Sequence, residues 1–135
     1  MTGTVVRHHA GDRFKSGLRA SFAYRDLGIR DASEGRVGAH VIRAVPGIPV
    51  SGEWHLHEVD FQMLYVLRGW VEFEFEDIGV VRLDAGSSVF QPPRVRHREI
   101  RHSDDLEVLE VTAPASFETR MVEAPVRGEA LPAAP

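Results

Sequence analysis

Turn-forming residues recur along this chain about every eight to twelve residues, and this rhythm limits the possible folds more than any other feature of the sequence. Glycine, proline and aspartate mark the turns, for example at Pro46, Gly86 and Pro92. Runs rich in β-branched and aromatic residues lie between them, and we expect strands at about 37–45, 53–57, 61–67, 70–76, 79–83, 87–91, 97–101 and 106–112. Many short strands at this spacing predict an all-β sandwich or barrel.

Two of these runs show how the strands should face. In residues 70–76, Val71, Phe73 and Phe75 alternate with glutamates, which is typical of an antiparallel strand with one face in the core and one in water. Residues 106–112 alternate too, but apolar side chains occur on both faces. One of these faces could lie in the core and the other against a partner subunit.

The chain divides into three parts by composition. We expect an N-terminal arm at 1–36, a β-barrel core at 37–113 and a partly flexible C-terminal extension at 114–135. Residues 12–27 are mixed in character and could hold a short helix or an arm. No long helix is predicted, and the last eight or so residues, rich in alanine and proline, are expected to be a loose tail.

Length, cysteine usage and charge exclude several classes of protein. A chain of 135 residues favours one domain, and the lack of cysteine excludes disulfides and cysteine-based zinc sites. The net charge of −4 and the lack of a lysine or arginine cluster argue against nucleic-acid binding. No apolar run has transmembrane length, and the N-terminus lacks a signal-peptide core. We expect a soluble, cytoplasmic protein that binds neither nucleic acid nor membrane.

The pair His55 and His57 is the first candidate for chemistry. Residues i and i+2 of a strand point to the same face, so both imidazoles should project together and could hold one metal ion. A chance pair is the alternative, because the chain has seven histidines and His8 and His9 are also neighbours. The context favours a site: a tight connection should return Gln62 beside the pair, and a later run leads from Gly86 through Pro92 to His97.

Together these residues resemble the two motifs of the cupin superfamily. The first motif is a His-x-His pair, a Glu or Gln, and a Gly, and here His55, His57, Gln62 and Gly69 follow it with four and then six residues between the last members. The second motif is matched by Gly86, Pro92 and His97. The resemblance covers about residues 37–112 and implies a single double-stranded β-helix, or jelly-roll, barrel.

Three positions depart from these motifs. Pro49 stands where the first motif begins with glycine, and Arg94 replaces the glycine that follows the proline of the second motif. Arg101 replaces the final asparagine of the second motif. Arg101 could point its charge toward the mouth of the barrel or be a solvated surface residue.

The resemblance implies a metal held by His55, His57, Gln62 and His97. Zinc is the expected metal, with iron, nickel and manganese as alternatives. Gln62 could instead hydrogen-bond a loop carbonyl. As a ligand, a neutral amide leaves a divalent ion with its full charge, which makes the ion a stronger Lewis acid than a carboxylate would.

This ligand set is most similar to that of the cupin aromatic polyketide cyclases of the tetracenomycin and resistomycin type. The implied reaction is aldol cyclisation of a poly-β-ketone in antibiotic biosynthesis, inside an apolar barrel that we expect Leu64, Val66, Val71, Phe73 and Phe90 to line. An iron- or nickel-dependent dioxygenase acting on a diketone or flavonol-like substrate is the first alternative. A non-enzymatic ligand-binding cupin is the second. The resemblance also implies a homodimer.

Three carboxylates are candidates for the general acid or base: Glu53, Glu99 and Glu110. Strand parity places Glu53 on the face of His55, and Glu99 and Arg101 on the face of His97. A salt-bridge role is the alternative for each glutamate. Tyr65 should point away from the barrel, and His40 and His102 could either line the cavity or lie on the surface.

Overall fold

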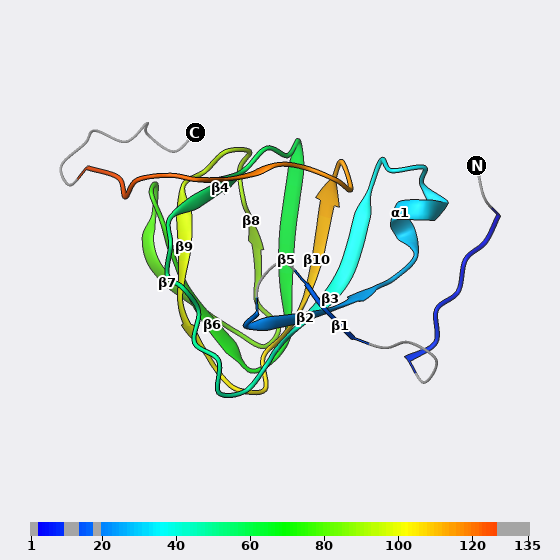
Figure 1. The fold of residues 1–135 in the computed structure, drawn as a ribbon, viewed down its shortest axis with the longest axis horizontal. Coiled ribbons are helices and arrows are strands. Elements are labelled where there is room, and N and C mark those ends of the chain that lie inside the picture. Colours follow the sequence, from blue (N-terminus) through cyan, green and yellow to red (C-terminus); the bar gives the residue numbers. More distant parts are fainter. Residues whose placement is uncertain (1–2, 10–13, 18–19, 127–135) are drawn as a thin grey trace.

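The structure, a computed structural model, describes residues 3–9, 14–17 and 20–126 and consists of two antiparallel sheets that face each other as a jelly roll (Figure 1). Sheet A has six strands, in the order β1 (Lys15–Ser16), β2 (Phe22–Asp26), β3 (Gly38–Ala44), β10 (Glu107–Ala113), β5 (Phe61–Arg68) and β8 (Ser88–Phe90). Sheet B has five, in the order β11 (Thr119–Met121), β4 (His55–His57), β9 (His97–His102), β6 (Trp70–Phe75) and β7 (Gly79–Asp84). The all-β jelly-roll prediction is confirmed.

The segment before the predicted core contributes to sheet A. Strand β2 pairs with β3 along its length, from Phe22 opposite Ala44 to Asp26 opposite His40. The helix α1 (Ile29–Ala32) is a single turn between these two strands. Residues 12–27, for which a short helix or an arm was expected, therefore hold strands where they are described. Within the described ranges, no helix has the length and apolar character needed to cross a membrane.

The apolar core lies between the two sheets. Strand β6 shows why: its alternating pattern turns Val71, Phe73 and Phe75 inward, and each of them is at most 5% exposed. They pack with inward residues of sheet A such as Leu64 and Val66. Burial of these apolar side chains stabilises the packing of the two sheets.

Gly69 makes the tight turn between β5 and β6. Its φ is +74°, in the left-handed region that glycine adopts without strain. A Cβ atom at this position would also lie 2.6 Å from Asp105 Oδ1 and 3.1 Å from the Cα atom of Leu106. Both the backbone angle and the close approach of the 103–106 loop therefore require glycine here.

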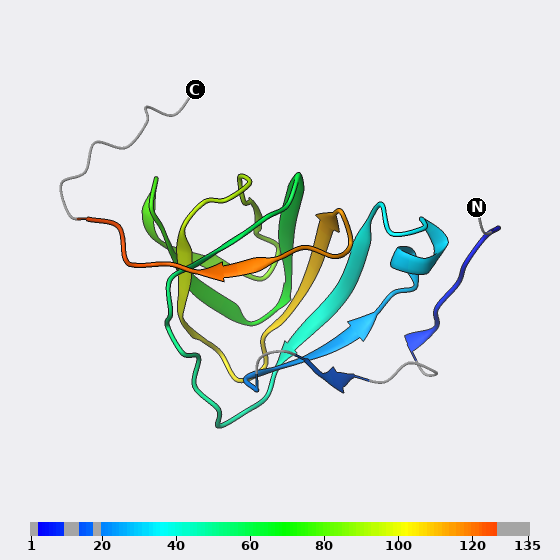
Figure 2. The same ribbon diagram turned by 45° about the horizontal axis from the view of Figure 1, so that its top comes forward.

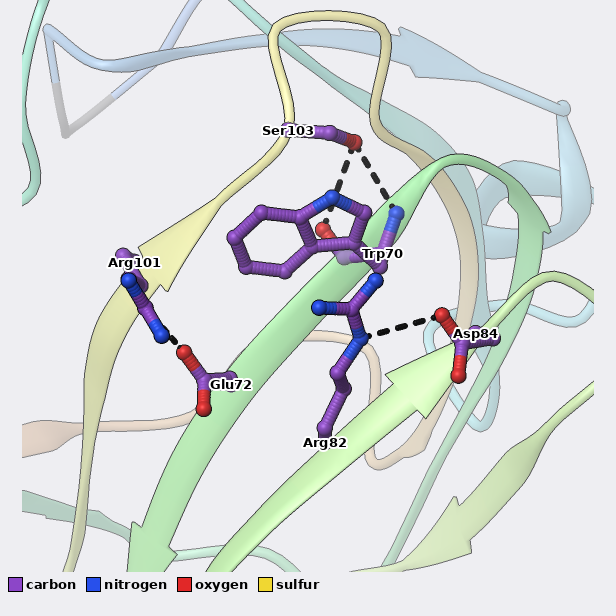
Figure 3. Close-up of polar contacts among 6 residues, drawn as sticks. All are labelled: Trp70, Glu72, Arg82, Asp84, Arg101 and Ser103. Carbon is purple, nitrogen blue, oxygen red and sulfur yellow. Dashed lines mark hydrogen bonds and ion pairs between the residues drawn. The ribbon is translucent and has the colours of Figure 1, made fainter.

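The outer face of sheet B is charged. Near the β5–β6 turn, the Arg82 guanidinium lies 4.3 Å from the ring centroid of Trp70, and its Nε bonds Asp84 Oδ1 at 3.1 Å (Figure 3). Arg101 approaches the same ring at 5.7 Å and also pairs with Glu72. These exposed contacts form a solvated surface layer.

The chain after β10 crosses the open end of the barrel to reach sheet B (Figure 2). There β11 pairs with β4, with Thr119 opposite His57 and Met121 opposite His55. Part of the segment expected to be an extension thus forms the edge of sheet B beside the histidines. Residues 127–135, which include the expected loose tail, lie outside the described residues.

Candidate metal centre

Three histidine side chains meet on the inner face of sheet B. His55 and His57 come from β4, and His97 comes from β9, directly opposite His55 in the strand register. One ring nitrogen from each residue lies within 4.8 Å of the others. The sequence places two of these rings by strand parity, and the β4–β9 pairing adds the third from forty residues away.

Each ring is held at its Nδ1 atom. His55 Nδ1 lies 2.9 Å from the carbonyl oxygen of Glu53, and His97 Nδ1 lies 3.0 Å from that of Val95. A carbonyl oxygen can only accept, so in these neutral rings Nδ1 carries the proton and Nε2 keeps its lone pair. His57 Nδ1 lies 2.9 Å from the Thr119 hydroxyl on β11. Nε2 is therefore the atom of His55 and His97 that can bind a metal ion.

The histidines are packed as well as hydrogen-bonded. His55 and His97 are each 2% exposed, and the ring of Phe75 stacks on that of His97 at a centroid distance of 5.6 Å. Phe117, from the crossing segment, contacts His57 edge-on at 5.4 Å. Apolar packing fixes the ring planes and limits the access of water, which strengthens electrostatic interactions at the cluster.

Gln62 approaches from sheet A. It is also 2% exposed, and its Nε2 donates a hydrogen bond to Glu110 Oε2 at 3.0 Å. The partner of this amide nitrogen is therefore a cavity carboxylate on β10, a contact that neither of the two sequence interpretations of Gln62 included. Glu110 Oε1 lies 2.7 Å from His40 Nε2 on β3.

A cavity of about 730 Å³ connects these groups. The three histidines, Gln62, His40 and the candidate carboxylates Glu53, Glu99 and Glu110 all line it. Its apolar lining includes Phe22, Leu64, Val71, Phe73, Leu106 and Phe117. The site is thus a polar cluster at one side of a largely apolar chamber, which is typical of small-molecule sites.

The sequence matches a known domain family at the same residues. A model of the cupin domain matches residues 42–112, more than half of the chain. The chain belongs to the cupin family. This match spans β4, β5 and β9, so it includes the histidine cluster and Gln62. A search of curated protein sequences finds no significant match to this cupin.

Solved structures agree with this assignment at the level of the fold. The polyketide cyclase RemF from Streptomyces resistomycificus is similar with a TM-score of 0.71 and 19% identity, over 93% of this chain and 88% of that one. KdgF from Halomonas sp. gives a TM-score of 0.66 and 20% identity, over 82% and 94%. Iron(II) HppE gives 0.62 and 16%, over 82% of this cupin and 60% of the other chain.

The donor set fits a divalent metal ion. Three imidazole nitrogens within 4.8 Å of one another could hold a single divalent ion. Two of the three rings are held in the tautomer that ligation requires, and imidazole suits zinc, iron and nickel alike. A three-histidine site of this kind in a cupin suggests a divalent metal ion. The similarity of this chain to other cupins agrees with an enzymatic role.

The two motif departures near His97 have separate explanations in this cupin. Arg94 has a φ of +61°, so it adopts the left-handed backbone that the motif's glycine would supply. It is the third residue of a turn closed by Val95 N donating to Pro92 O at 3.2 Å, and a type II turn requires positive φ there. The turn before His97 therefore survives the substitution, with backbone strain at Arg94.

The prediction from strand parity that Arg101 shares the face of His97 is wrong. In the pairing of β9 with β6, Phe73 faces Glu99 but Glu72 faces Arg101, so a bulge at Ile100 shifts the register. Glu99 stays inside the barrel, whereas Arg101 turns outward to Glu72 (Figure 3). The bulge also turns His102 inward against Phe22, at a ring distance of 5.3 Å.

The expectation that Phe90 lines the barrel is wrong. It is 56% exposed and lies on the outer face of sheet A, where its ring centroid is 5.9 Å from that of Phe61. Its strand neighbour Gln91 lines the cavity instead and is 2% exposed. Tyr65, by contrast, points away from the barrel as predicted, with 39% of its surface exposed.

Three residues at the site carried little or no signal in the sequence. Thr119 and Phe117 belong to the crossing segment, whose short strand and proline-rich surroundings show no periodicity. Gln91 precedes two prolines and reads as a loop residue. A polar residue next to the motif proline was the single available hint for Gln91, and for Thr119 only the β4–β11 pairing identifies the contact.

Proposed function

We propose that this cupin is a zinc-dependent cyclase that closes aromatic rings in a poly-β-ketone. The observation that carries the proposal is the cluster of His55, His57 and His97, which shares a largely apolar chamber of about 730 Å³ with the neutral amide of Gln62. The similarity of this cupin to the polyketide cyclase RemF over nearly the whole chain supports the same reaction class.

Two groups of residues have different roles, one in binding the ion and one in shaping the substrate. His55, His57 and His97, with Gln62, would hold the ion, which when bound supplies Lewis acidity for a ketone oxygen and the enolate that develops from it. Leu64, Phe73 and Phe117 line the chamber and would keep the poly-ketone curled and dry. Aldol closure then joins the enolate carbon to a second carbonyl carbon, whose oxygen gains a proton, and loss of water gives the aromatic ring.

Among the three candidate carboxylates, we assign the proton transfer from the substrate methylene to Glu99. It follows His97 by two residues on β9, so both side chains enter the same chamber. Both oxygens of Glu110 already contact His40 and Gln62. Glu53 is exposed, whereas Glu99 is half-buried.

Metal analysis and product analysis test the proposal together. The purified protein should contain about one zinc per chain, and it should convert a poly-β-ketone to a cyclised product without consuming oxygen. A double variant, His55→Ala with His57→Ala, should lose both the metal and the product. Unchanged product from the double variant would refute the cyclase proposal.

An oxygen-dependent enzyme with iron or nickel at the site is the second candidate. The structural similarity of this chain to the iron(II) form of HppE favours iron as the metal. The substrate would then be a diketone or flavonol-like compound, and the same histidines would bind iron or nickel. Iron in the purified protein together with oxygen uptake on substrate addition would select this alternative. Zinc content without oxygen uptake would reject it.

We also propose that the chain forms a homodimer through the outer face of sheet A. Phe61, Tyr65, Leu67 and Phe90 are exposed on this face, each by 38% or more. Apolar groups gathered on one sheet face are characteristic of interfaces. Tyr65→Glu should shift the protein from dimer to monomer in light scattering, whereas Val80→Glu, on β7 of the other sheet, should leave the mass unchanged. A monomeric wild-type protein would refute this proposal.

A further inference from the structure

Three side chains form a continuous polar chain across the inner face of sheet A. Gln62 on β5 donates from Nε2 to Glu110 Oε2 at 3.0 Å, and Glu110 Oε1 lies 2.7 Å from His40 Nε2 on β3. Strand β10 runs between the other two strands, with Glu110 opposite both His40 and Leu64. The ring of Tyr24 packs edge-on against His40 at 5.4 Å. These three polar side chains and Tyr24, which packs against one end of the series, therefore all belong to sheet A.

The hydrogen bond to Glu110 decides which way the Gln62 amide faces. An amide has one end that donates and one that accepts, whereas a carboxylate only accepts. The NH₂ group must therefore face Glu110, and the amide oxygen must occupy the other end. Only the oxygen can ligate a metal ion, because the amide nitrogen has no available lone pair.

We propose that Glu110, braced by His40, is a positioning residue that orients the amide oxygen of Gln62 toward the histidine cluster. The inference rests on the proposed metal site. It also accounts for the amide in the ligand position. The negative charge that a glutamate ligand would supply is instead carried by Glu110, the hydrogen-bond partner of Gln62. A glutamate at position 62 would face Glu110 across about 3 Å, where two carboxylates cannot both remain charged without a large cost.

Charge exchange between the two positions makes the proposal testable. Glu110→Gln replaces the obligatory acceptor by an amide, which can pair with either end of Gln62, so the orientation is lost. Gln62→Glu sets two carboxylates against each other. The double variant, Gln62→Glu with Glu110→Gln, restores one donor facing one acceptor, now with the charge on the ligand.

The measurements are the zinc dissociation constant, obtained with a competing chelator, and the visible absorption of the cobalt(II)-substituted protein. Glu110→Gln should weaken zinc binding about 10- to 100-fold and change the cobalt spectrum, because the oxygen ligand is no longer held. His40→Gln should give a smaller loss in the same direction. The double variant should recover the affinity of the wild type or exceed it. The metal-free Gln62→Glu protein should melt at a lower temperature than the metal-free double variant.

Glu107→Gln is the matched control. It makes the same chemical change on the same strand, but Glu107 pairs outward with Arg68 at 3.9 Å. The control should bind zinc as the wild type does. If Glu110→Gln and its control both bind zinc with wild-type affinity and an unaltered cobalt spectrum, the positioning role is wrong while the metal site stands. If the wild type binds no divalent metal, the proposed function fails as well, and His55→Ala then changes nothing.

If Glu110→Gln does not fold, His40→Gln and the double variant carry the test. Wild-type affinity in His40→Gln together with no recovery in the double variant would overturn the proposal. Weakened binding in the first and recovery in the second would support it without any result from the single Glu110 variant.

Discussion

The two walls of the cavity hold their metal-facing groups in different ways. On the sheet B wall, His55 and His97 are each fixed by a carbonyl oxygen two residues earlier in their own part of the chain. On the sheet A wall, Gln62 is fixed by Glu110 and His40, which come from two other strands. Backbone acceptors survive most substitutions, whereas a side-chain partner is lost with one. Substitutions near His55 and His97 should therefore change the orientation of these rings little. Substitutions of Glu110 or His40 should change the orientation of Gln62.

Removal of a histidine should have the largest effect. His55→Ala removes a proposed metal ligand itself. Zinc affinity should therefore fall more than the roughly 100-fold expected when only the hydrogen-bond partner of a ligand is lost. Metal content by elemental analysis and affinity by chelator competition measure the change. His102→Ala is the control, because His102 bonds the Ser103 carbonyl at 2.8 Å and does not line the cavity. Full zinc content in His55→Ala would show that the cluster is not the site.

Glu99→Gln separates chemistry from metal binding on the same wall. The substitution removes the carboxylate that we assign to proton transfer, so kcat should fall by about 100-fold or more, while zinc content should not change. Steady-state cyclisation kinetics provide the readout. Glu74→Gln on neighbouring β6 faces outward to Arg98 at 2.8 Å and should retain full activity. Normal turnover in Glu99→Gln would transfer the role to another residue.

Thr119→Val tests His57, whose Nδ1 partner is the Thr119 hydroxyl. His57 should lose its Nδ1 partner, and zinc affinity should fall by about 10-fold, which is less than for loss of a ligand. Valine preserves the shape of threonine and suits a strand, so β11 should stay paired. Thr119→Ser keeps the hydroxyl and should restore the affinity. Equal affinities in the valine and serine variants would remove Thr119 from the site.

The smallest effect should come from the turn that leads into His97. Arg94→Gly removes a left-handed conformation that is costly for arginine, and it should raise the free energy of unfolding by about 0.5–1 kcal/mol. Arg94→Ala is the control, because it also loses the 3.8 Å contact to Glu58 but keeps the strain. Urea denaturation compares the two. An alanine variant as stable as the glycine variant would mean that the backbone strain is negligible.

The sheet B wall was largely predictable from sequence, because its rules are local. Strand parity places His55 and His57 together, and motif spacing brings in His97. The eight predicted strands correspond to β3–β10, with bounds that differ by about two residues at most. Parity failed where an interaction across strands broke the alternation, as at the bulge near Ile100, which turned Arg101 outward. The expected inward position of Phe90 was also wrong, because its three-residue strand is too short for a pattern to assign a face.

The sheet A wall was only partly predictable, since its contacts depend on which strands become neighbours. Gln62 and Glu110 were separate candidates, and nothing in their sequence surroundings indicates that they touch. His40 could be placed only once β3 was known to pair with β10. Strand β11 was missed for the same reason: its three residues have no pattern of their own, and their partner is more than sixty positions earlier.

The late position of Thr119 has a consequence for the nascent protein. All three histidines leave the ribosome before the residue that orients His57, and β4 has no β11 partner until that point. A chain stalled between His97 and Thr119 has the ligands but lacks the outer edge of their sheet. Metal capture during synthesis should therefore be complete only after Thr119 has been made, and a free chain truncated after Pro114 should take up zinc more weakly than the full chain.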